Sequence, residues 1–191
     1  MPTCSSPSSL LQAFQDGYTL RDTTQADEFM QLFTKNAEVI GTNGLRPGSG
    51  EWYTDRISAR ELVHDDWESW GDVRLLLEES HINQVGDAAW CACPATVTQH
   101  FGRDHFQSYL NFIKNYIETS PLPAEEKLHY ILRGGNNTIY ELARGEKFVW
   151  ALRITFLMVK EEDGWKFAQV HFSFPTITFP DVRIFEKGDI Q

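Results

Sequence analysis

Apolar and polar side chains alternate near the end of the chain and predict a strand from Trp165 to Phe174. Alternation puts Gln169, His171 and Ser173 on one face, in line with Trp165 and Phe167. It puts Ala168, Val170, Phe172 and Phe174 on the other face. A polar row beside a buried sheet lines a cavity, contacts another subunit or faces solvent. Which of the three applies here is the functional question.

The rest of the pattern divides the chain into helices followed by strands. Helical spacing predicts a first helix from Ser9 to Leu20, and patterns resembling capping boxes predict a second helix from Thr24 and a third from Ser58 to about Trp67. Period-two alternation predicts strands at 37–42, 73–85, 88–101, 138–143 and 148–160, besides 165–174, with hairpin turns at Gly86-Asp87 and Asp163-Gly164. Helices first and an antiparallel meander afterwards indicate an α+β fold.

One helical segment interrupts the strands. Apolar positions between Phe106 and Ile117 recur at helical spacing, and Ala124 to Leu132 adds further turns. We therefore expect a single domain over 1–191, with a flexible tail at 1–8, a helical insertion at 105–132 and a C-terminal extension at 175–191.

Composition narrows the classes of partner. The 191 residues carry 17 Lys and Arg against 27 Asp and Glu, a formal charge of -10, and the basic residues are scattered. This charge opposes binding to nucleic acid or to an anionic membrane. The absence of a signal-like N-terminus and of a long apolar run predicts a cytoplasmic protein, which its three cysteines fit.

Three segments in order resemble the SnoaL-like proteins of the ketosteroid-isomerase and nuclear-transport-factor-2-like superfamily. These are the helix that leads into 39–42, the stretch from Glu51-Trp52 through Trp70-Gly71-Asp72 to Trp90, and the closing 152–173. The resemblance implies N-terminal helices packed in the concavity of a strongly bent antiparallel sheet, a cone-shaped, cystatin-like roll. It also implies a mostly apolar cavity and a homodimer formed sheet against sheet.

The resemblance does not choose a reaction, because its members include isomerases, dehydratases, cyclases and binding proteins. The steroid isomerases place an acidic base at the end of the first strand. The matching segment here, Val39-Ile40-Gly41-Thr42, has no carboxylate, and only Glu38 lies near it. That difference argues against the same proton-transfer chemistry.

His171 is the candidate acid or base, because an imidazole can hold or release a proton near neutral pH. Gln169 and Ser173 lie on the same strand face, and Arg153 joins them if the last two strands pair. Trp52 follows a glycine-rich loop, where it could border a cavity mouth. The alternative for His171 is a core or interface histidine, and for Arg153 an ion pair across a dimer.

The predicted ligand is a small apolar or aromatic molecule, either anionic or carbonyl-bearing. We expect no cofactor and no metal, because Cys91 and Cys93 lack zinc-type partners and nucleotide-binding motifs are missing. Three hypotheses remain open: a small-molecule-binding domain, an isomerase, dehydratase or cyclase that uses His171, and a dimeric interaction module without catalysis.

Overall fold

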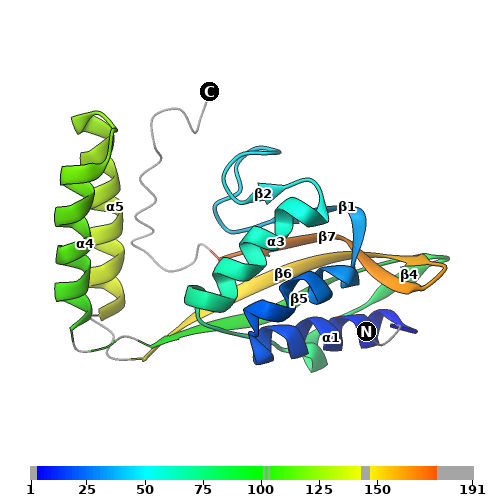
Figure 1. The fold of residues 1–191 in the computed structure, drawn as a ribbon. Coiled ribbons are helices and arrows are strands. Elements are labelled where there is room, and N and C mark those ends of the chain that lie inside the picture. The colour runs from blue at the N-terminus through cyan, green and yellow to red at the C-terminus, as the bar shows by residue number, and fades with distance from the viewer. Residues whose placement is uncertain (1–3, 101, 103, 143–146, 176–191) are drawn as a thin grey trace. The chain divides into compact units, whose positions relative to one another are not determined.

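Seven strands form one curved, unclosed sheet in the computed structural model, which describes residues 4–100, 102, 104–142 and 147–175 (Figure 1). The strands are β1 (Phe33–Ile40), β2 (Trp52–Tyr53), β3 (Asp72–Leu75), β4 (Asn83–Val85), β5 (Ala88–His100), β6 (Lys147–Glu161) and β7 (Gly164–Ser173). They follow the order β2-β1-β7-β6-β5-β3, and β4 pairs with β5. The bent α+β architecture and the hairpin turn at Gly86-Asp87 are as predicted. The second hairpin turns at 162–163, one residue before the predicted Asp163-Gly164.

The sheet is mixed and not antiparallel throughout. β1 pairs with β7 in parallel, with Ile40 beside His171, whereas β7 pairs with β6 antiparallel, with His171 beside Thr155. The expectation of an antiparallel sheet was wrong at this pair, because period-two alternation identifies strands without showing which strands pair or in what direction.

A β-bulge also changes the faces of β7. The register with β6 shifts between Leu157 and Met158, which pair with Gln169 and Phe167 and leave Ala168 as the extra residue. Trp165 and Phe167 are therefore buried on the same side as Val170 and Phe172, and not in line with Gln169 as simple alternation predicted.

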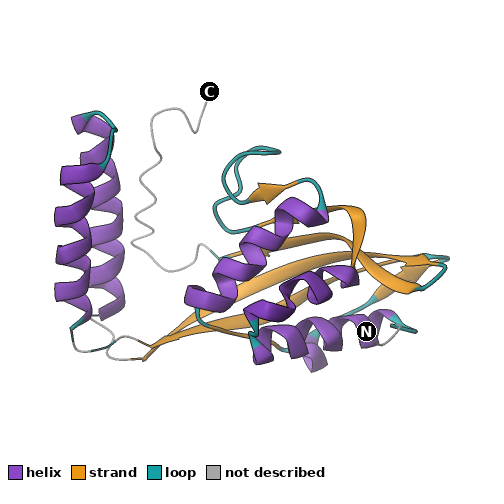
Figure 2. Ribbon diagram, viewed as in Figure 1, coloured by secondary structure: helices purple, strands orange, loops and turns teal. Residues whose placement is uncertain are grey.

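Helices cover one face of the sheet (Figure 2). The segments are α1 (Pro7–Leu20), η1 (Thr23–Gln25), α2 (Ala26–Phe29), η2 (Met30–Leu32), α3 (Arg56–Asp65), η3 (Asp66–Trp70) and η4 (Leu77–Glu79). Asp22 caps η1 and Asp55 caps α3, so both segments begin a few residues before the expected Thr24 and Ser58. Apolar periodicity locates such helices better than it locates their ends.

Aromatic rings fill much of the space between helices and sheet. The ring of Phe14 in α1 lies within 5.6 Å, centroid to centroid, of those of Phe29, Phe156 and Phe167. Tyr18 stacks on Phe14 at 4.7 Å and meets Trp67 edge to face at 6.1 Å. Burial of these rings supplies a large part of the hydrophobic stabilisation and leaves open space at the rim.

The described chain divides into two compact units, and the second contains the inserted helices. It comprises residues 99–148 and 176–191, of which the structure describes α4 (His105–Thr119) and α5 (Ala124–Leu142). The predicted insertion is thus helical. The predicted strand at 138–143 was wrong: residues 138–142 continue α5, because the apolar spacing from Leu128 to Ile139 is helical, and residue 143 lies outside the described part.

The expected terminal segments are only partly described. Within the tail predicted at 1–8, Cys4 is buried, its carbonyl accepts a hydrogen bond from the Trp165 amide at 2.9 Å, and Ser6 caps α1. The extension predicted at 175–191 lies outside the described residues after Pro175. Among the helices described, none is long and apolar enough to cross a lipid bilayer.

Candidate functional site

The five predicted ligand-binding residues lie on the face of the sheet that points away from α1. In β7 the buried Val170 and Phe172 point toward the helices, so the half-buried His171 between them points the other way. Arg153 pairs with Ser173 in the neighbouring strand, and Trp52 pairs with Ile40, which pairs with His171. We call this surface the open sheet face.

Glu38 joins two of the five predicted residues on the open sheet face. Its carboxylate accepts a hydrogen bond from Trp52 Nε1 at 2.9 Å and a second, short one from Gln169 Nε2. The acid nearest to the expected catalytic position therefore ties β2 to β7 and does not point into the concavity. For these five residues a role in ligand binding stays a prediction.

A separate cavity lies at the rim on the opposite side, with a volume of about 260 Å³. None of the five predicted residues is among its described lining. It is bordered by the loop after β1, by β2, by α3 and η3, and by the end of β7, and its lining residues are Gly41, Thr42, Asn43, Glu51, Tyr53, Leu62, Asp65, Asp66, Ser69, Trp70 and Phe172.

Asp66 is the most perturbed acid of this cavity. Tyr18 Oη, from a buried side chain in the last turn of α1, donates a hydrogen bond to Asp66 Oδ2 at 2.8 Å. Burial raises the pKa of Asp66 to about 7, and the charges of Glu51 and Asp65 act in the same direction, whereas the Tyr18 hydrogen bond and Arg21 oppose the rise. Burial and the neighbouring Asp66 also raise the pKa of Tyr18 well above its usual value.

The cavity walls combine aromatic rings with an ordered acidic loop. Trp70 meets Phe172 edge to face at 5.8 Å, and Tyr53 adds a third ring to the lining. Asn43 donates its backbone and side-chain N–H groups to Glu51 Oε2 and Oε1 at 2.8 and 2.9 Å. A Cβ atom at Gly41 would collide with the Glu51 side chain, so the glycine lets that carboxylate fold over the loop.

Sequence reasoning missed Asp66, although one signal was present. Asp66 follows Leu62 by four positions, so an acid stands on the apolar face of a helical run. Its raised pKa, however, comes first from burial in the packed structure, and its hydrogen-bond partner Tyr18 is 48 residues away in the chain. Only the packed structure brings the two together.

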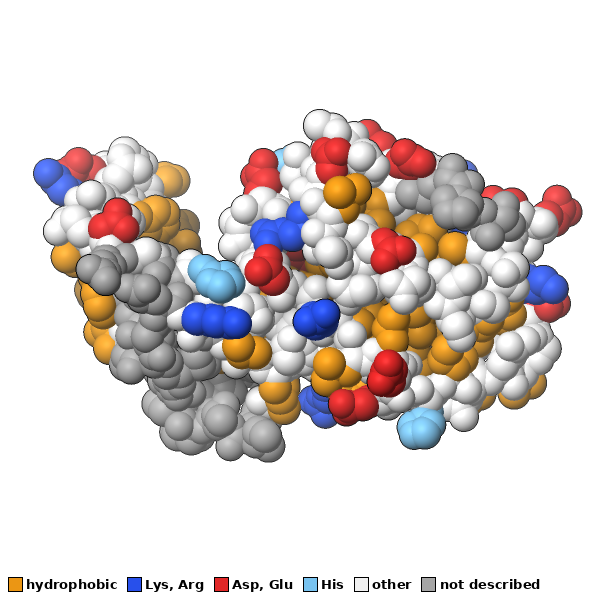
Figure 3. Space-filling model, turned by 90° about the horizontal axis from the view of Figure 1, so that it is seen from below, with side chains coloured by type: hydrophobic (Ala, Val, Ile, Leu, Met, Phe, Trp, Pro, Cys, Tyr) orange, Lys and Arg blue, Asp and Glu red, His pale blue; other side chains and the backbone are white. Residues whose placement is uncertain are grey.

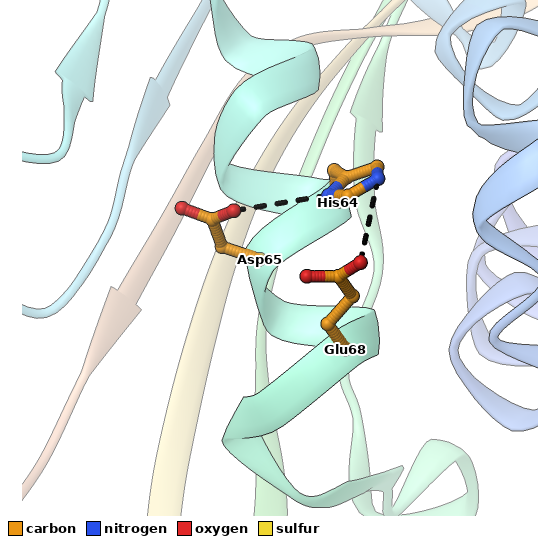
Figure 4. A group of neighbouring side chains, drawn as sticks. All are labelled: His64, Asp65 and Glu68. Carbon is orange, nitrogen blue, oxygen red and sulfur yellow. Dashed lines mark ion pairs between the residues drawn. The ribbon is translucent and has the colours of Figure 1, made fainter.

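His64, Asp65 and Glu68 form a second polar group near the cavity (Figure 4). Asp65 Oδ1 lies 3.8 Å from His64 Nδ1, and Glu68 Oε1 lies 3.8 Å from Nε2. The two carboxylates thus face different nitrogens of one ring, and these nitrogens point in different directions. This arrangement suits ion pairing with a protonated imidazole better than three ligands around one metal ion.

A curved mixed sheet with helices in its concavity and a cavity at the rim defines an α+β fold of the cystatin-like, NTF2-like class. The chain belongs to the family described as the SnoaL-like domain, which matches residues 10–111. No curated protein is detectably similar in sequence.

Solved structures show the same fold at low sequence identity. An uncharacterised protein with a cystatin-like fold from Caulobacter vibrioides has 11% identity and a TM-score of 0.53, over 88% of this chain and 87% of that chain. A proposed dehydratase of the NTF2-like family from Streptomyces avermitilis has 14% identity and a TM-score of 0.52, over 87% and 92%. A ketosteroid isomerase-like protein from Erwinia carotovora has 13% identity and a TM-score of 0.51, over 87% and 91%.

Proposed function

We propose that the chain binds a small, flat, mainly apolar molecule bearing a hydroxyl or carbonyl group in the rim cavity, with Asp66 meeting that polar group. The observation that carries the proposal is an acid with a pKa of about 7, held by Tyr18 beside a cavity with aromatic walls. The lining combines three carboxylates and three neutral polar residues with apolar side chains, those of Tyr53, Leu62, Trp70 and Phe172. Apolar surface beside placed polar groups is typical of small-molecule sites. The volume suits a ligand of one or two rings.

The raised pKa of Asp66 supports the proposal that the bound molecule is a substrate, with Asp66 as the acid or base. Near neutral pH both forms of Asp66 are populated, so it can donate a proton to a leaving hydroxyl or accept one beside a carbonyl. This is the chemistry of an isomerase, dehydratase or cyclase. The proposal assigns it to Asp66 in preference to His171, because His171 lies on the open sheet face and outside the cavity lining.

Electrostatics favours a neutral ligand over an anionic one in this cavity. Glu51, Asp65 and Asp66 are carboxylates in its lining, and no Lys or Arg is among the described lining residues. An anion would be repelled unless Asp66 were protonated, so the carbonyl-bearing alternative suits the cavity better than the anionic one.

The open sheet face supports a homodimer as a second role. Trp90, Val149 and Leu157 are 44%, 48% and 39% exposed on strands whose other faces are buried, and they share this face with His171 and Arg153. Exposed apolar side chains next to hydrogen-bonded polar ones are typical of a subunit interface. In that arrangement the five predicted residues would serve association and not ligand binding.

The proposed cavity can be tested by mapping a ring-bearing probe onto the protein. 2-Naphthol, which is flat and carries one hydroxyl, should shift the amide NMR signals of Tyr53, Ser69 and Trp70. Asp66→Asn should weaken its binding about tenfold, because a hydrogen bond to an ionisable group is lost or changed. The matched control, His171→Ala, should leave the affinity unchanged.

The same experiment separates the two faces of the sheet. Shifts centred on Gln169 and His171, with affinity lost in His171→Ala, would overturn the rim cavity as the site and favour the open sheet face. Absence of any localised shift with 2-naphthol and with its ketone counterpart 2-tetralone would also count against the proposal.

A further inference from the structure

The helical hairpin of the second unit uses only part of its apolar surface to hold its two helices together. Tyr116 stacks on Tyr130 at 4.5 Å between ring centroids, and Phe112 lies 6.2 Å from Tyr130. Tyr109 Oη donates to the Ile131 carbonyl at 3.0 Å, and its ring occupies the space that a Cβ atom at Gly134 would need. These contacts define the inner seam between α4 and α5.

A second row of apolar side chains lies outside this seam on each helix. In α4, Phe106, Leu110 and Ile117 are 49%, 58% and 49% exposed. In α5, Leu128, Leu132 and Ile139 are 59%, 53% and 61% exposed. Apolar side chains are visible at the surface of the hairpin, at the left of Figure 3. We call the six residues the hairpin stripe.

Both rows have the same spacing along their helices. Each places apolar residues at i, i+4 and i+11, with Ile113 in α4 and Gly135 in α5 at the intervening i+7 position. Residues with this spacing form one line along a helix, because each residue advances by about 100°. In α4 the line lies about a quarter turn from the inner seam, in the direction of increasing residue number. In α5 it lies more than a quarter turn but less than half a turn from the seam, in the same direction.

The two rows lie on the same side of the hairpin. α4 and α5 run in opposite directions, as the contact of Lys127 Nζ with the Ile117 carbonyl at 3.0 Å and that of Tyr109 with Ile131 require. A rotation of less than half a turn in the same sense on two antiparallel helices leads to the same side of their common plane. The hairpin stripe is therefore one apolar face, two helices wide, in which the buried Ile113 and the half-buried Gly135 separate the outer positions of each row.

We propose that this face binds the hairpin of a second copy of the chain, so that two hairpins form an antiparallel four-helix bundle. Its six side chains, each about half exposed, present on the order of 600 Å² of surface, most of the roughly 800 Å² that one partner contributes to a stable interface. Equal spacing on both helices lets α4 of one copy face α5 of the other through a two-fold axis parallel to the helices.

Charges at the border of the stripe fit the same pairing. Lys114 flanks the row on α4 and Glu125 flanks the row on α5, each on the side away from the inner seam. Within one hairpin these two positions lie on opposite edges. When α4 faces α5 of a second copy, Lys114 and the other copy's Glu125 come to the same edge, where opposite charges favour that orientation.

Sedimentation equilibrium of the full chain tests the proposal. Leu110→Glu with Leu132→Glu buries charge in the proposed interface and should halve the mass of the wild-type assembly. Ser108→Glu with Asn115→Glu adds the same charge on the far side of α4, where both side chains are exposed, and should leave the mass unchanged. Circular dichroism checks that both variants keep their helices.

A charge exchange adds a test that does not depend on apolar contacts. Lys114→Glu should weaken association by about two- to fivefold, and adding Glu125→Lys should restore it. An assembly mass unchanged in Leu110→Glu/Leu132→Glu, or equal losses in that variant and the Ser108/Asn115 control, would overturn the proposal. If the glutamate variant lost its helices, the milder variant Leu110→Ala/Leu132→Ala would replace it. An assembly mass unchanged in that variant would also overturn the proposal.

Discussion

Burial makes the charged form of the Asp66 carboxyl group less stable in the folded protein than in the unfolded chain. Its folded pKa of about 7 exceeds the ordinary value of 3.8, so between these pH values the folded protein keeps a proton that the unfolded chain has lost. Stability contributed by this group is therefore present at low pH and is lost as pH rises toward 7.

Replacing Asp66 by asparagine should remove this dependence on pH while keeping an acceptor for Tyr18. Relative to wild type, the Asp66→Asn protein should gain about 2 kcal/mol of unfolding free energy between about pH 4 and pH 8, less than the full shift implies because the cavity is open to water. Urea unfolding across this range measures the difference.

Asp163 provides a control of the opposite sign. Its pKa is lowered, first by the hydrogen bond from Lys166, so its contribution is present at neutral pH and is lost as pH falls. Asp163→Asn should therefore lose stability relative to wild type as pH rises. Parallel pH curves for wild type and Asp66→Asn would contradict a half-buried Asp66 that holds its proton up to about pH 7.

At the scale of the element, α1 positions Tyr18 and is held at both ends. Ser6 and Ser9 exchange backbone and side-chain hydrogen bonds, both at 3.1 Å, at its start. At its end Arg21 takes a left-handed conformation, with φ of 52°, and donates to the Trp67 carbonyl at 3.0 Å and to Asp72 at 2.7 Å. The helix that carries Tyr18 is thereby tied to the segment that carries Asp66.

Ser6→Ala should lower the free energy of unfolding by about 1 kcal/mol, because it leaves the Ser9 amide without its capping acceptor. Ser8→Ala is the matched control, since Ser8 is exposed in the same first turn and should change stability little. Thermal or urea unfolding compares them. Equal losses in the two variants would show that the cap contributes nothing beyond helix propensity.

The same helix shows where sequence patterns suffice. Spacing of Leu10, Phe14 and Tyr18 identified its buried face correctly, because apolar periodicity reports directly on a helix that lies against a core. Its start escaped prediction because the capping pair is Ser6 with Ser9, whereas the usual signature has an acid or amide at the second position. Two serines that each accept a hydrogen bond from the other's backbone amide are recognised only in the structure.

For the whole molecule, alternation separated the two faces of β7 near its end but could not say which one meets a ligand. His171 and Gln169 share a polar face as predicted, yet that face lies opposite the helices. The cavity instead uses Phe172, from the apolar face, and Asp66. Such a choice depends on which side the helices cover, a property of long-range packing that local periodicity does not contain.

A charge placed on the open sheet face tests whether that face joins two copies. Thr155 is exposed and pairs with His171, so Thr155→Glu would put a carboxylate at the centre of a sheet-to-sheet dimer and should halve the assembly mass. Ser8→Glu adds the same charge on an exposed turn of α1 and should not. The open sheet face and the hairpin stripe consist of residues from different units, and two such two-fold interfaces together give a tetramer. Disrupting one interface should then leave a dimer, and combining Thr155→Glu with Leu110→Glu and Leu132→Glu should yield a monomer. An assembly mass unchanged in Thr155→Glu would show that Gln169, His171 and Ser173 face solvent, and it would rule out the sheet-to-sheet dimer.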